Sequence, residues 1–190
     1  MIEQLVKKNR SYRRFHEDQK VDRQTLLELL ELARLTPSAG NLQPLRYILS
    51  HDPDRNQLIF SYLSWAAYLK DWPGPAPGQR PSAYILILGD RKAAKMFAYD
   101  AGIAAQTILL GAVEKDLGGC ILASIDRKGL SEALRIPDHY EILLAIALGK
   151  PVEKVVIEPV GKDGNIKYWR DEQGVHHVPK RALQDLILPI

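Results

Sequence analysis

Apolar side chains follow two kinds of pattern along this chain. In the first, they recur every three or four positions, as on the buried face of a helix. This spacing predicts helices at Ile2–Lys8, Asp22–Leu35, from Asp52-Pro53 through Tyr62 or as far as Lys70, at Ala101–Leu117 and at Arg127–Leu134. In the second, short apolar runs are bounded by turn residues, as in buried strands. These runs predict strands at Leu45–Leu49, Ala83–Leu88, Cys120–Ala123 and Ile142–Leu148.

Several element boundaries carry a chemical signal. Asp22 and Asp100 are suited to cap the helices that follow them. Thr36-Pro37 should end the first of these helices, because the residue before a proline avoids helical geometry. Gly118-Gly119 should end the second. That second helix is apolar around most of its circumference, so we expect it to be the core helix or the seam of a dimer.

Two segments depart from the regular patterns. Trp72–Pro81 contains four prolines and two glycines, which excludes a helix or a strand. With Trp65 and Tyr68 just before it, the segment could form an aromatic lid, while packing in the core is expected for at least one of these rings. Near the C-terminus, Val160–Ile166 resembles a hairpin with an Asp-Gly turn.

Composition describes an ordinary globular protein. The 190 residues are 46% hydrophobic and 26% charged, and nothing demands more than one domain, residues 1–190. A net charge of +3 is too small to argue for nucleic-acid binding. The longest apolar run is far shorter than the roughly 18 residues of a membrane span, and the charged N-terminus lacks an export signal. With a single cysteine, Cys120, the expected location is the cytoplasm.

Several kinds of catalytic site find no support in the sequence. There is no glycine-rich nucleotide motif and no serine in a G-x-S-x-G elbow. Cys120 opens an apolar strand and should be an inert buried thiol. Cys120 with His176-His177 is too small a set to predict a metal site, so none is expected. The lack of a self-sufficient acid and base constellation fits an enzyme whose cofactor carries the chemistry.

Two polar segments remain as candidate sites. Arg10–Phe15 places three arginines beside a serine, which is either an anion site or a solvated basic turn. Thr36–Pro44 joins a helix to a strand through proline, glycine and short polar side chains. Such a corner can hold a flat ligand, although ordinary loops have the same composition.

Four segments, in order, resemble the FMN-dependent nitroreductase family. They are RSYRRF at Arg10–Phe15, TPSAGNLQP at Thr36–Pro44, Tyr99–Asp126 and Glu141–Pro151. The resemblance implies an α+β fold, a three-layer α/β/α sandwich with a mixed, mostly antiparallel central sheet. It also implies an intertwined homodimer, in which the C-terminal tail from about Val155 to residue 190 contacts the partner subunit.

The same resemblance implies FMN as the cofactor and assigns residues to it. Arg10 and Ser11 would meet the phosphate, and Arg13 would lie by the pyrimidine edge of the ring. Lys180 or Arg181 would complete the phosphate site. Pro37, Ser38 and Ala39 of the other subunit would line the ring and ribityl chain. Asn41 and Gln43 would hydrogen-bond to the flavin or hold the loop. Ala123 and Ser124 fall where the family places a backbone N–H near flavin N5.

Three positions depart from the family pattern. Asn9 stands where many members carry an arginine, which would weaken phosphate binding. Leu45 and Ile121 replace frequent tryptophans, so altered packing with little change in chemistry is expected.

The implied function is an FMN-dependent NAD(P)H oxidoreductase with a ping-pong mechanism. Flavin N5 would carry the chemistry, with no catalytic side chain, and the oxidant would be a nitroaromatic, a quinone or a similar molecule. One alternative is a non-catalytic protein that binds FMN for storage, delivery or sensing. Another is a different enzyme on the same fold, such as a reductive dehalogenase or a flavin-fragmenting enzyme. The loop from Trp65 to Pro81 would select the oxidant.

Overall fold

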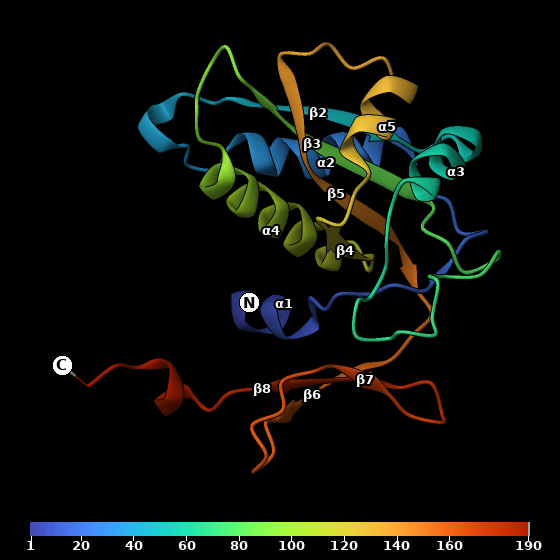
Figure 1. The fold of residues 1–190 in the computed structure, drawn as a ribbon, viewed down its shortest axis with the longest axis vertical. Helices are drawn as coiled ribbons and strands as arrows, with labels where there is room; N and C mark the ends of the chain where they lie inside the picture. The colour runs from blue at the N-terminus through green and yellow to red at the C-terminus, as the bar shows by residue number, and fades with distance from the viewer. Residues whose placement is uncertain (190) are drawn as a thin grey trace.

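The computed structural model describes residues 1–189, and its centre is a five-stranded sheet with helices on both faces (Figure 1). The strands are β1 Phe15–His16, β2 Leu45–Ser50, β3 Ala83–Asp90, β4 Gly118–Leu122 and β5 Tyr140–Pro151. β5 lies in the middle, with β3 and then β2 on one side and with β4 and β1 pairing to it as well. Every pair of these strands is antiparallel. Beside them, an isolated parallel bridge joins Ser11 to Gly119 of β4.

The sheet separates two apolar cores. Alternate residues of β3 face opposite sides, so Ile85 packs with α2 (Arg23–Arg34) and α4 (Ala98–Glu114). Leu86 packs on the other side with α3 (Pro53–Ser61) and α5 (Arg127–Ala133). All eight residues of β3 are buried, as its continuous apolar run predicts. The three-layer α/β/α arrangement inferred from the sequence is therefore confirmed.

The N-terminal helices lie close to their predicted positions. α1 spans Ile2–Lys8, and α2 is capped by Asp22, whose carboxylate accepts a 2.7 Å hydrogen bond from the amide of Thr25. α3 ends at Ser61, so the extension toward Lys70 is wrong. The chain turns away because Leu63 pairs with Ile125 and Ala66 adopts a positive φ of 43°.

The boundaries of α4 differ from the prediction. Asp100 lies inside the first turn and does not cap the helix, which begins at Ala98. The helix stops at Glu114, where Asp116 takes the left-handed conformation with φ 56°. Gly118 and Gly119 belong to β4, and a Cβ on Gly119 would approach the carbonyl oxygen of Ala147 to 2.4 Å. These glycines therefore permit close pairing with β5.

Most of α4 is buried, as predicted, but one stripe is exposed. Ala104, Ala105 and Ile108 are buried in the first core. Tyr99 and Ile103, by contrast, are 71% and 40% exposed. An apolar stripe left open on a core helix is what the dimer-seam interpretation requires.

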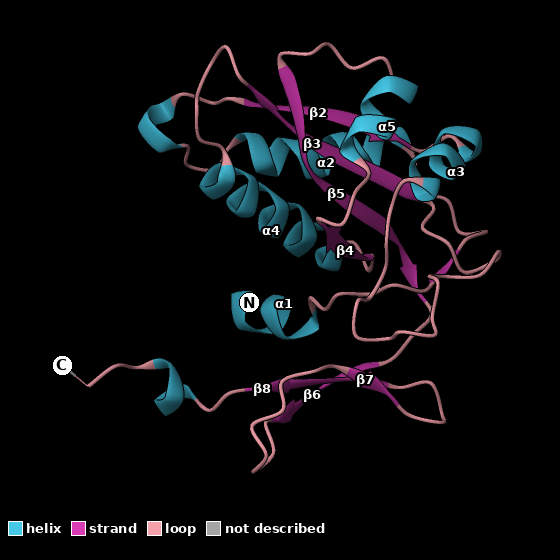
Figure 2. Ribbon diagram, viewed as in Figure 1, coloured by secondary structure: helices cyan, strands magenta, loops and turns pink. Residues whose placement is uncertain are grey.

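The C-terminal tail folds into a second, smaller sheet (Figure 2). β6 (Val155–Pro159) runs parallel to β8 (His176–Lys180), and β7 (Trp169–Arg170) is antiparallel to β8. The turn at Gly161–Gly164 is present, with a 3.0 Å bond between its ends. The predicted hairpin is nevertheless wrong, because β6 pairs with a strand farther along the chain. A short 3-10 helix, Leu183–Leu186, follows on a segment that leads away from the sandwich (Figure 1).

The proline-rich segment lacks helix and strand, as predicted. Trp65 is only 7% exposed and packs against Gly74, where a Cβ would come within 2.8 Å of its ring. Packing of one aromatic ring in the core is therefore confirmed, while Tyr68 is 48% exposed. Within residues 1–189, no helix has both the length and the apolar character needed to cross a membrane.

Candidate functional site

A cavity of about 230 Å³ lies where the N-terminal arm, α4, β4 and the small C-terminal sheet meet. Four of the residues predicted to bind a cofactor line it: Arg10, Ser11, Arg13 and Lys180. Lys180 is the last residue of β8, near the opposite end of the chain from the arm. The fold thus gathers three cations from both ends of the sequence around one space.

The arginines of this cavity keep donors without protein partners. The Nε atoms of Arg10 and Arg13 are buried and make no hydrogen bond. Arg10 uses Nη2 to donate to the carbonyl of Val6 at 2.7 Å, and Arg13 uses Nη1 to donate to that of Ser11 at 3.2 Å. Because a guanidinium has only donors, the free positions suit an anionic or carbonyl-bearing ligand.

The arm that carries these arginines is fixed to the main sheet. Ser11 bridges Gly119, and the amide of Tyr12 donates to the carbonyl of Gly119 at 3.0 Å. Asn9, which replaces the family arginine, is buried and its amide donates to Gln106 of α4 at 3.3 Å. Asn9 therefore anchors the arm to the helix at this position.

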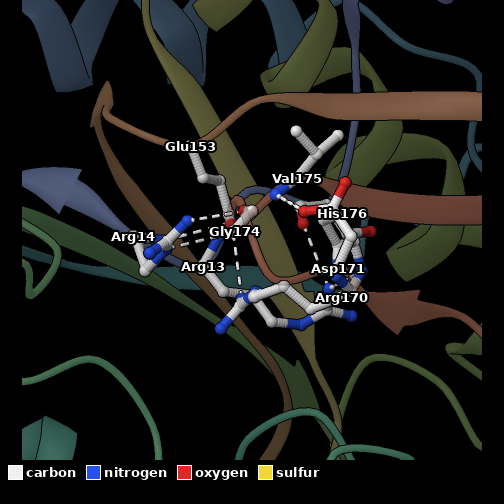
Figure 3. A network of polar contacts seen from close by, with 9 residues as sticks. Arg13, Arg14, Glu153, Arg170, Asp171, Gly174, Val175 and His176 are labelled. Carbon is white, nitrogen blue, oxygen red and sulfur yellow. Dashed lines mark hydrogen bonds and ion pairs between the residues drawn. The ribbon is translucent and has the colours of Figure 1, made fainter.

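Glu153 ties the arm to the small sheet (Figure 3). Its side chain is 1% exposed, and its carboxylate accepts hydrogen bonds from the amides of Arg13 and Arg14. It also pairs with Arg170 of β7 at 3.1 Å. Arg14 completes the connection by donating to the carbonyl of Gly174 at 2.9 Å. A buried carboxylate is tolerated here because each oxygen has donors around it.

His176 faces the same cavity from β8. Its Nε2 lies 3.2 Å from Nη1 of Arg13, and the guanidinium carbon of Arg13 lies 4.9 Å from the centroid of the Tyr168 ring. Burial and the neighbouring charges of Arg13 and Arg170 lower the pKa of His176 to about 4. The imidazole is therefore uncharged at neutral pH.

Glu153, Tyr168 and His176 are functional candidates that sequence reasoning missed. Glu153 follows the last family-like segment as one charge in a polar turn, and its partner Arg170 is distant in sequence. His176 was considered only as a metal ligand beside His177. Burial would have singled out Glu153 and His176. However, β8, which contains His176, and its partner β7 are short and have no strong apolar pattern, so the sequence does not reveal this burial.

The Thr36–Pro44 segment lies at a different cavity. Pro37, Ser38 and Gln43 line a groove of about 370 Å³ beside α2 and β2. Ala39 and Asn41 are exposed residues of the same loop. None of these five residues lines the first cavity. The sequence-based expectation is that Pro37, Ser38 and Ala39 come from the other subunit, while Asn41 and Gln43 bond to the flavin or hold the loop.

Asp100 fixes this loop from the first turn of α4. Its carboxylate accepts hydrogen bonds from the hydroxyl of Ser38 at 2.5 Å and from the amide of Ala39 at 3.1 Å. The Ser38 oxygen in turn accepts from the amide of Gln43 at 2.9 Å. Asn41 and Gln43 have positive φ values of 54° and 49°, so the loop holds a conformation that non-glycine residues rarely adopt.

Three predicted residues lie near the first cavity without lining it. Ala123 and Ser124 follow the end of β4, close in sequence to Ile121, which does line the cavity. The Ser124 carbonyl accepts from the amide of Ser64 at 2.9 Å, which connects it to the aromatic loop. Arg181 is exposed beyond Lys180. Cys120 is buried, as predicted, and burial raises the pKa of its thiol.

Comparison with known proteins gives consistent results. Residues 6–150 match the model of the Nitroreductase family. A protein of Archaeoglobus fulgidus, named as an NADH dehydrogenase/NAD(P)H nitroreductase, is 27% identical over 149 residues, covering 74% of this chain and 80% of that protein.

Solved structures extend the likeness to the fold. An FMN-dependent nitroreductase from Clostridium difficile superposes with a TM-score of 0.63 at 27% identity, covering 81% of this chain and 89% of that one. A nitroreductase family protein from Clostridium novyi has a TM-score of 0.67 at 19% identity, covering 97% of this chain and 98% of that one. With the family model spanning most of the sequence, this chain belongs to the Nitroreductase family of oxidoreductases.

Proposed function

We propose that this protein is an FMN-dependent NAD(P)H oxidoreductase whose cofactor binds in the cavity lined by Arg10, Ser11, Arg13 and Lys180. The observation that carries the proposal is the pair of buried, unpartnered Nε atoms on Arg10 and Arg13 beside a third cation. Unpartnered buried donors are costly, and a phosphate or a flavin carbonyl would satisfy them. The similarity to a solved protein described as an FMN-dependent nitroreductase supports the choice of cofactor.

Each residue has a distinct part in this proposal. Arg10, Ser11 and Lys180 hold the phosphate, and Arg13 lies at the pyrimidine edge of the ring. Bound FMN supplies hydride and electron transfer at N5, which no side chain of this chain could provide. A guanidinium beside the pyrimidine edge favours the negative charge that accompanies reduction. The backbone at Ala123 and Ser124 would lie near N5.

NAD(P)H and the oxidant would bind in turn at the same open face of the flavin ring, which makes the mechanism ping-pong. A nitroaromatic, a quinone or a similar flat acceptor fits a site bounded by aromatic rings. Tyr68 and Tyr168 lie with centroids 4.9 Å apart, so the aromatic loop reaches the wall of the cavity. This contact supports a role for the loop from Trp65 to Pro81 in choosing the acceptor. The lone buried thiol, Cys120, suits a reducing cytoplasm.

A second copy of the chain would complete the site. Leu183, Leu186, Ile187 and Leu188 are 69%, 65%, 63% and 82% exposed on a segment that leads away from the sandwich (Figure 1). β2 is an edge strand, and beside it lies the groove lined by Leu27, Leu30, Leu45 and Tyr47. An apolar tail and an apolar groove at a free strand edge are complementary in two-fold symmetry. Pro37, Ser38, Ala39, Asn41 and Gln43 would then serve the partner's flavin.

The test is reconstitution of the purified protein with FMN, followed by anaerobic addition of NADH or NADPH. Quenching of FMN fluorescence on binding and bleaching of the visible band by either nicotinamide are the expected results. Bound FMN that stays oxidised with both nicotinamides would favour the storage or sensor alternative. Absence of binding would overturn the proposal. A strictly monomeric protein that still binds FMN would overturn the shared site alone.

A further inference from the structure

His176 and Arg13 meet at the wall of the candidate cofactor cavity. The 3.2 Å separation joins His176 Nε2 on β8 to Nη1 of Arg13 in the N-terminal arm (Figure 3). Because a guanidinium has only donors, Nε2 must be the acceptor, and the ring proton must reside on Nδ1. The sequence resemblance assigns no role to His176.

The other contacts of Arg13 leave its guanidinium dependent on this acceptor. The Ser11 carbonyl accepts from the same Nη1 at 3.2 Å, and the Tyr168 ring lies 4.9 Å from the guanidinium carbon. Glu153 accepts from the backbone amide of Arg13, so it fixes the main chain and not the tip of the side chain. Of these contacts, His176 alone supplies a side-chain nitrogen as acceptor for the guanidinium.

We propose that His176 is a positioning residue, whose uncharged imidazole holds the Arg13 guanidinium so that its unpartnered donor meets the pyrimidine edge of bound FMN. This role rests on the proposed function. It gives the C-terminal sheet of the same chain a second part in the site beside Lys180, since His176 and Tyr168 also come from that part of the fold. The small sheet thereby affects the redox properties of the site.

The surroundings of His176 keep it uncharged. The cationic or ionisable groups that act on it are Arg13, Arg14, Arg170 and His177. Together with burial, since the residue is 1% exposed, they depress the pKa of the imidazole to about 4. A protonated His176 could not accept from Arg13 and would repel it. The contact should therefore persist throughout the neutral range.

Two substitutions of His176 separate the loss of the hydrogen-bond acceptor from the loss of ring packing. His176→Phe keeps a ring against Tyr168, whose centroid is 5.2 Å from that of His176, but it removes the acceptor. His176→Gln restores a neutral acceptor without a ring. His177→Gln is the matched control, because adjacent residues of a strand face opposite sides and His177 bonds to Glu158 and Asp171 instead.

The primary readouts are the FMN dissociation constant and the midpoint potential of bound FMN. His176→Phe should weaken FMN binding about tenfold and lower the midpoint potential, as expected when a charged hydrogen bond is lost. His176→Gln should recover most of both, and His177→Gln should match the wild type. Wild-type values for both quantities in a folded His176→Phe protein would overturn the positioning role.

A cofactor-free measurement tests the contact itself. Titration of the His176 ring by NMR in flavin-free protein should give a midpoint well below the ordinary histidine range, and Arg13→Gln should raise it. If Arg13→Gln leaves this midpoint unchanged, the contact between Arg13 and His176 is overturned. The NMR titration does not depend on whether either His176 variant folds. If the titration behaves as expected but the wild type binds no FMN, the proposed function fails and the positioning role fails with it. If Arg13→Gln weakens FMN binding while His176→Phe does not, only the positioning role is overturned.

Discussion

Glu153 and Arg170 form a buried ion pair, 3.1 Å apart, that joins the end of the main sheet to the small C-terminal sheet. Both side chains are largely excluded from solvent, at 1% and 16% exposure. The same carboxylate accepts hydrogen bonds from the amides of Arg13 and Arg14, so one side chain fixes the arm and the tail together. The N-terminal arm, the end of the main sheet and the small C-terminal sheet are therefore held together by Glu153.

Glu153→Gln should destabilise the protein. Replacing the carboxylate leaves the Arg170 charge buried with a weaker partner, and breaking a buried ion pair typically costs about 3–5 kcal/mol. Because the glutamine oxygen can still accept one bond, we expect a loss of about 2–3 kcal/mol in the free energy of unfolding. Urea denaturation measures it. Glu3→Gln is the control, because it breaks an exposed ion pair with Lys7 and should change stability by less than about 0.5 kcal/mol. If Glu153→Gln and Glu3→Gln change the free energy of unfolding equally, Glu153 does not have the stabilising role assigned to it.

Arg10→Ala combined with Arg13→Ala should give folded protein with little bound FMN. Each charge-assisted hydrogen bond contributes about 1.5–3 kcal/mol, so the pair should weaken binding by at least about 100-fold. Fluorescence quenching measures the dissociation constant, and circular dichroism checks the fold. Arg91→Ala is the control, since Arg91 pairs with Glu141 and is 58% exposed. Wild-type FMN affinity in the double variant would refute this placement of the cofactor.

His177 should make stability depend on pH in the neutral range. It lies between Asp171 and Glu158, at 3.1 and 3.0 Å, and stacks on Trp169. Hydrogen bonding to Asp171 in particular raises the pKa of His177 in the folded protein. The folded state thus binds the proton more tightly than the unfolded state does. The stabilisation is fully present below the ordinary histidine pKa and is lost as pH rises through the raised folded value.

Denaturation of wild type and His177→Gln at several pH values would measure this contribution. The difference in unfolding free energy between the two proteins should shrink from pH 6 to pH 9. A difference that stays constant over that interval would show that the ion pairs of His177 do not stabilise the folded state. His176 contributes in the opposite sense, because its lowered pKa costs stability as pH falls toward about 4.

Patterns that are local in the sequence predicted the fold well. The buried strands β3 and β5 and the cap at Asp22 depend on neighbouring residues alone, and all three were anticipated. Asp100 was misassigned because its carboxylate has partners on a loop about sixty positions away, which outweigh its local tendency to cap. The parallel pairing of β6 with β8 is likewise a long-range choice that an Asp-Gly turn does not reveal.

The residues of the candidate site likewise differ in whether local sequence patterns could identify them. Arg10, Ser11, Arg13 and Lys180 could be identified from the family-like motifs, and they do line one cavity. His176 could not, because its significance arises only when β8 brings it 3.2 Å from a residue 163 positions earlier. Its uncharged state depends on burial and on surrounding arginines, and neither property can be read from an adjacent pair of histidines.

The exposed apolar tail should be what holds two subunits together, so Leu186→Asp with Ile187→Asp should produce a monomer. Burying an apolar side chain of this size contributes roughly 1.5–3 kcal/mol, and two-fold symmetry doubles the effect of each change. Sedimentation equilibrium measures the mass, and FMN titration should show reduced affinity, because the Thr36–Pro44 loop would no longer reach the partner's cofactor. Ile166→Asp is the control, since Ile166 is 48% exposed but lies outside the apolar end at Leu183, Leu186, Ile187 and Leu188. A dimeric double variant would refute the role of the tail, whereas a monomeric one with wild-type FMN affinity would show that a single chain holds the cofactor.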